Sequence, residues 1–142
     1  MKVEEQYFDV LQNLETAIVT AYDHNPRLLD FDVMDALNVL IRSYTLEERG
    51  VSPRLPPVSG PSQPVLEATW RICEWRLGRQ ALNPADRGGG RLTTGHLSVG
   101  ELVLCLKRIR NSVRLWTERG GRQGYLDYVR HFLEDADRRA GT

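Results

Sequence analysis

The side chains with the clearest chemical potential are the basic residues around position 110. Six of them lie within 16 consecutive positions: Lys107, Arg108, Arg110, Arg114, Arg119 and Arg122. Guanidinium groups bind phosphate and carboxylate through paired hydrogen bonds, and Tyr125 and Tyr128 could stack on nucleic-acid bases. The pattern fits a nucleic-acid binder. It also fits pairing with acidic side chains of the same chain or of a second copy.

The charge distribution along the chain favours pairing with acidic side chains. The 142 residues contain 19 basic and 19 acidic side chains, and the sequence pI is about 6.8. Residues 1–50 hold 4 basic and 10 acidic groups, a net charge of −6, so residues 51–142 carry +6. This pI is far below the range typical of nucleic-acid-binding domains. We therefore expect the basic half to contact the acidic half, within the chain or across a homodimer.

A second candidate anion site is the glycine-rich segment 83–95, which reads NPADRGGGRLTTG. Its polar candidates are Arg87, Arg91, Thr93 and Thr94. Backbone N–H groups in such a loop can hold an anion. However, the segment contains neither GxGxxG nor GxxxxGK[ST], and no predicted strand precedes it. A plain connecting loop is the favoured interpretation, because glycine commonly marks loops.

The sequence assembles no catalytic or metal-binding set. The histidines are far apart in the sequence: His24, His96 and His131. Ser98 lies in a near match to the nucleophile elbow, but that motif needs a strand-to-helix turn. Ser98 and Glu101 instead fit a helix capping box. We expect no bound metal ion and no cofactor, and the sequence favours a non-catalytic protein over an enzyme.

The two cysteines, Cys73 and Cys105, each fall inside an apolar helical pattern. This favours two buried, reduced thiols in a reducing compartment. No apolar run approaches the roughly 20 residues that cross a bilayer, and the first residues lack the pattern of a secretion signal. We expect a cytoplasmic protein without membrane contact.

The hydrophobic periodicity predicts an all-α fold: a single-domain bundle of four to five helices with no sheet. The expected helices cover residues 3–22, 33–49, 65–82, 99–119 and 125–138. Residues 51–64 contain five of the seven prolines, so this segment should be an extended connector.

The helix over 99–119 has the clearest pattern, because its apolar residues follow steps of three and four. This heptad seam comprises Val99, Leu102, Leu106, Ile109, Val113 and Trp116. We expect the helix to be central. Trp75 lies off the apolar stripe of its helix and Tyr128 at the margin of its own, which makes both candidate partner contacts if they are exposed.

These observations favour a non-catalytic cytoplasmic helical-bundle protein that acts through protein–protein interaction, with self-association into a homodimer or binding to another protein. A nucleic-acid-binding regulatory protein that uses the basic residues is the alternative. A small-anion binder or enzyme built on the glycine-rich loop is the second alternative.

Overall fold

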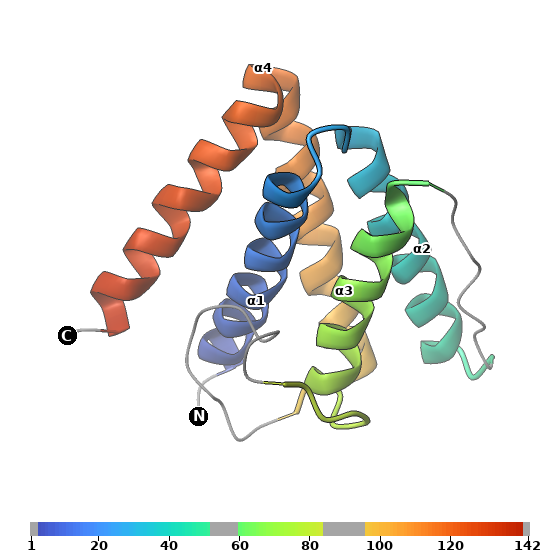
Figure 1. Cartoon of the computed structure of the whole chain (residues 1–142). Helices are drawn as coiled ribbons and strands as arrows, with labels where there is room; N and C mark the ends of the chain where they lie inside the picture. Colours follow the sequence, from blue (N-terminus) through green and yellow to red (C-terminus); the bar gives the residue numbers. More distant parts are fainter. Residues whose placement is uncertain (1–2, 52–59, 84–95, 141–142) are drawn as a thin grey trace.

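The computed structural model describes residues 3–51, 60–83 and 96–140. These residues form four helices and no strand: α1 (Val3–His24), α2 (Asp30–Glu48), α3 (Ser62–Arg76) and α4 (Val99–Ala140). The all-α class is confirmed (Figure 1). Within the described ranges, no helix combines the length and the apolar character that a membrane crossing requires.

The first half of α4 lies at the centre of the helix packing. Its seam residues Leu102, Leu106 and Ile109 are fully buried, and α4 packs against both α1 and α2, while α3 packs against α1 and α2. The heptad seam therefore fills the core of its own chain. It offers no surface to a second copy.

The chain reverses direction inside α4. Gly120 (φ −144°, ψ 16°) and Gly121 (φ 64°, ψ −155°) are non-helical, and the second half of α4 turns back beside α1 (Figure 1). The two helices expected over 99–119 and 125–138 correspond to these two halves. The backbone angles of Gly121 are essentially restricted to glycine. A Cβ at Gly124 would overlap the carbonyl oxygen of Trp116 at 2.7 Å, so the two halves approach closely only because position 124 has no side chain.

Local signals define where the helices begin and end. The capping box at the start of α4 is confirmed: the Ser98 N–H donates to Glu101 (3.1 Å) and the Glu101 N–H donates to Ser98 Oγ (3.2 Å). α3 ends at Arg76, earlier than the expected residue 82, because the chain leaves the helix through Gly78 with φ 79°. α3 also begins earlier than expected, at Ser62, so the last residues of the segment 51–64 are helical and not part of an extended connector. Residues 52–59 and 84–95 lie outside the described residues, so these parts of the two connectors stay predictions.

A buried polar contact joins α1 to α3. Arg76 is only 3% exposed, and its guanidinium donates to Asn13 Oδ1 through Nε (3.0 Å) and through Nη2. The backbone oxygen of Arg76 accepts the Leu97 N–H at 2.9 Å. A buried guanidinium must keep its hydrogen-bond partners, so this residue fixes the end of α3 against α1 and against the segment that enters α4.

Leu106→Ala and Leu104→Ala test this packing as a matched pair, because the two leucines lie on one helix and are 0% and 61% exposed. Leu106→Ala should lower the free energy of unfolding by about 2–5 kcal/mol, since it leaves a cavity in the core. Leu104→Ala should change it by less than about 0.5 kcal/mol. Urea unfolding at low micromolar concentration measures both, and equal losses would contradict the central position of α4.

Candidate functional site

The structure divides the six basic candidates into two groups. Four are exposed: Lys107, Arg108, Arg114 and Arg119. Arg110 and Arg122 are half-buried and contact other helices or loops of the same chain. The basic run is therefore not one continuous binding surface.

Arg122 binds the end of α1. Its guanidinium donates to the backbone oxygens of Tyr22, of Asn25 at 3.4 Å and of Pro26 at 3.2 Å, and it lies 4.8 Å from the centre of the Tyr22 ring. The last carbonyls of a helix have no partner within that helix, and a cation there is favoured by the helix dipole. Arg122 thus holds the reversal of α4 against α1.

Arg110 and Arg119 also have contacts within the chain. Arg110 Nη1 donates to Asn38 Oδ1 on α2 at 3.3 Å. Arg119 remains exposed, with its guanidinium carbon 5.5 Å from the Trp116 ring centre. An exposed guanidinium over an indole stabilises weakly, so Arg119 keeps most of its capacity to bind a partner.

The side of the first half of α4 that faces away from the core forms a surface that we call the outer face. Its members are all exposed: Leu104, Lys107, Arg108, Asn111, Arg114, Leu115 and Glu118. Their formal charges sum to +2. Leu104 is 61% exposed and Leu115 is 42% exposed, and both lie on a stripe with Arg108 and Asn111 at steps of four, three and four. Two large aliphatic side chains thus lie at the ends of this stripe, with basic side chains between them.

The two aromatic partner-contact candidates are only half-buried and have neighbours in the same chain. The guanidinium carbon of Arg76 lies 4.2 Å from the Trp75 ring centre. Tyr128 stacks on Trp116 with ring centres 5.1 Å apart and planes 12° apart. This stacking joins the two halves of α4, so Tyr128 has one ring face already covered.

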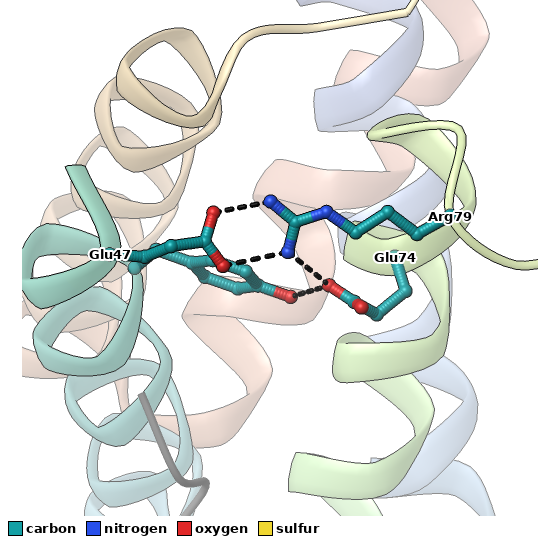
Figure 2. A network of polar contacts seen from close by, with 4 residues as sticks. Glu47, Glu74 and Arg79 are labelled. Atoms are coloured by element: carbon teal, nitrogen blue, oxygen red, sulfur yellow. Dashed lines mark hydrogen bonds and ion pairs between the residues drawn. The ribbon is translucent and has the colours of Figure 1, made fainter. Parts of the chain in front are cut away.

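A polar cluster joins α2 to the end of α3 (Figure 2). Arg79 donates to both carboxylate oxygens of Glu47 and lies 3.6 Å from Glu74, and the Tyr44 hydroxyl donates to Glu74 at 2.7 Å. The hydrogen bonds from Arg79 hold the pKa of Glu47 below its usual value. The cluster stabilises the contact between two helices, since its charged groups are already paired.

Glu15 is a buried carboxyl between α1 and α4 that the sequence did not single out. It is 2% exposed and accepts a hydrogen bond from the Tyr125 hydroxyl. Burial raises the pKa of Glu15 to about 7, against the opposing effects of the Tyr125 bond and of the positive charge of Arg108. The available signal was its position, because Glu15 shares a helix face with Leu11, Ile18 and Tyr22.

A groove of about 380 Å³ lies between α1 and the second half of α4. Its walls include Val19, Leu126, Val129 and Leu133, and its charged and polar lining residues are Asp23, Gln123, Asp127, Arg130 and Glu134. The four charged residues sum to −2. We call this feature the acidic groove. Leu126 and Leu133 are partly buried and pack against the core, and the sequence gives no signal that α1 lies opposite them.

The described residues contain no group of three side chains that could hold a metal ion. Both cysteines are free and buried, and burial raises the pKa of Cys105 to about 12, so this thiol is a poor nucleophile. The glycine-rich candidates Arg87, Arg91, Thr93 and Thr94 lie outside the described residues. Within the described residues, the outer face and the acidic groove each combine apolar with charged side chains.

Comparisons of the chain with protein-family models, with curated proteins and with solved structures give no match.

Glu15→Gln tests the buried carboxyl through the pH dependence of stability. Because the pKa of Glu15 is raised from 4.5 to about 7, the native state binds the proton more tightly, and stability falls as the pH rises between these two values. The amide can still accept the Tyr125 hydrogen bond. At about pH 8.5 the variant should exceed the wild type by about 2–3 kcal/mol, and at about pH 4 the two should agree. Urea unfolding across this range measures the difference.

Glu47→Gln is the control with the opposite sign. The pKa of the Glu47 carboxylate is lowered in the folded protein. Its contribution to stability is therefore present at neutral pH and is lost as the pH falls through this lowered pKa. This variant should be less stable than the wild type at neutral pH. For Glu15→Gln, a free energy of unfolding below that of the wild type at alkaline pH would contradict the argument that burial disfavours the Glu15 carboxylate.

Proposed function

We propose that this chain is a non-catalytic protein-interaction module of the cytoplasm, and that it binds an acidic amphipathic helical surface through the outer face of α4. The observation that carries the proposal is the exposure of Leu104 and Leu115 at the two ends of a basic helix face. Aliphatic side chains that stay in water on a helix otherwise packed in the core are candidate contacts for another protein.

The chemistry of the outer face indicates the kind of partner. Its two exposed leucines suit the apolar side of a helix, and Lys107, Arg108 and Arg114 between them suit carboxylates. Complementary charge speeds association and selects the partner. Two outer faces would repel each other, because each carries a net charge of +2, so a symmetric contact of this face with itself is disfavoured.

Nucleic acid is the second candidate partner, supported by the four exposed basic side chains. Phosphate contacts need cations rather than aliphatic side chains, and two exposed leucines lie at the ends of the stripe that holds Arg108. Arg110 and Arg122 contribute little to such a surface, because both bind groups of their own chain. These observations favour protein over nucleic acid.

A synthetic amphipathic helix tests the proposal by fluorescence anisotropy. The probe carries leucines at i, i+4, i+7 and i+11 with glutamates beside them, and a second peptide replaces the glutamates with lysines. The glutamate peptide should bind, and Leu104→Ala/Leu115→Ala should weaken binding at least tenfold, about 1.4 kcal/mol. Leu29→Ala, at a leucine that is 55% exposed elsewhere, should leave the affinity unchanged.

A short DNA duplex is the competing probe in the same assay. Binding to the duplex that falls steeply with salt, without binding to the glutamate peptide, would favour the nucleic-acid alternative. Equal affinity for both peptides would contradict the role assigned to the basic side chains.

A further inference from the structure

The acidic groove presents the complement of the outer face on the same chain. The groove has apolar walls at Leu126 and Leu133 with acidic residues around them. The outer face has two exposed leucines, Leu104 and Leu115, with the basic residues Lys107, Arg108 and Arg114 between them. The formal charges of the two surfaces are −2 and +2.

The lengths of the two surfaces also agree. The α4 residues that line the groove extend from Gln123 to Glu134, and the stripe of the outer face extends from Leu104 to Leu115. Each span covers 11 helical steps, or about 16 Å at 1.5 Å per residue. A helix laid along the groove could therefore contact it over its whole length.

The charges in the groove differ in how far they are already paired. Asp127 lies 3.5 Å from Arg130 and accepts a hydrogen bond from Gln123 at 2.9 Å. Glu134 lies 3.8 Å from His131, with 58% of its side chain exposed, and Asp23 is exposed. Asp23 and Glu134 are the carboxylates most available to a cationic partner.

From this complementarity we infer that the occupant of the groove is the outer face of a second copy of this chain. Each copy then supplies one outer face and one groove. We infer that both surfaces of one copy meet the same partner, which gives a closed two-fold dimer with two equal contacts and not an open chain. The inference rests on the proposed function, because it identifies the partner of the outer face. The reciprocal arrangement places Lys107 and Arg114 of each copy beside Asp23 and Glu134 of the other.

Charge reversal on both surfaces gives a complementation test. The first variant is Lys107→Glu/Arg114→Glu, and the second is Asp23→Lys/Glu134→Lys. Each variant alone places like charges together at both contacts, so its dimer dissociation constant should rise at least tenfold. A mixture of the two variants places opposite charges at both contacts and should form a heterodimer. Sedimentation velocity with the full chain at about 100 μM distinguishes monomer from dimer for each variant and for the mixture.

Matched controls keep the same net charge change on other helices. Arg42→Glu/Arg71→Glu and Asp35→Lys/Glu67→Lys alter exposed residues of α2 and α3, and both should remain dimeric. Circular dichroism and urea unfolding of every variant separate loss of association from loss of folding.

The outcomes separate this inference from the proposed function. A wild-type chain that stays monomeric at about 100 μM overturns the dimer, while binding of the glutamate peptide would still support the outer face. If the first variant disrupts the dimer and the second does not, only the role of the groove is overturned. Variants that are each monomeric and fail to associate when mixed overturn the reciprocal contact. A dimer insensitive to both variants, together with no peptide binding, overturns both proposals.

Discussion

The reversal of α4 at Gly120–Gly121 is the constraint on which the surfaces of this protein depend. The angles of Gly121 (φ 64°, ψ −155°) turn the second half of the helix back toward α1. Arg122 then donates to the backbone oxygen of Tyr22 in the last turn of α1 and to that of Pro26 just after the helix. A straight α4 would leave Leu126, Val129 and Leu133 far from α1. The acidic groove, the Trp116–Tyr128 stacking and the Glu15–Tyr125 contact all follow from this turn.

The first half of α4 combines two surfaces of opposite character. One side buries Leu102, Leu106 and Ile109 completely, while the other side keeps Leu104 and Leu115 in water. The few other helices of this small bundle cover only part of the circumference of α4. The uncovered part is where binding chemistry remains available.

Buried polar groups add specificity at the contacts between helices. Arg76 and Asn13 fix α3 against α1, and Glu15 and Tyr125 fix the second half of α4 against α1. Each pair satisfies hydrogen bonds that an apolar neighbour could not, so the helices are held in one register and not only pressed together. The raised pKa of Glu15 shows that this specificity has a cost, because a carboxyl group out of water resists ionisation.

The sequence alone determined the helical class, the central position of the helix after Val99 and the capping box at Ser98 and Glu101. These features depend on neighbours three or four positions apart, which the sequence displays directly. Only the tertiary structure decided that Arg122 binds α1, that Glu15 is buried and that Leu104 and Leu115 stay exposed. These properties depend on which helix lies opposite each side chain. The periodicity of one helix specifies its apolar side, but it cannot specify how much of that side its neighbours cover.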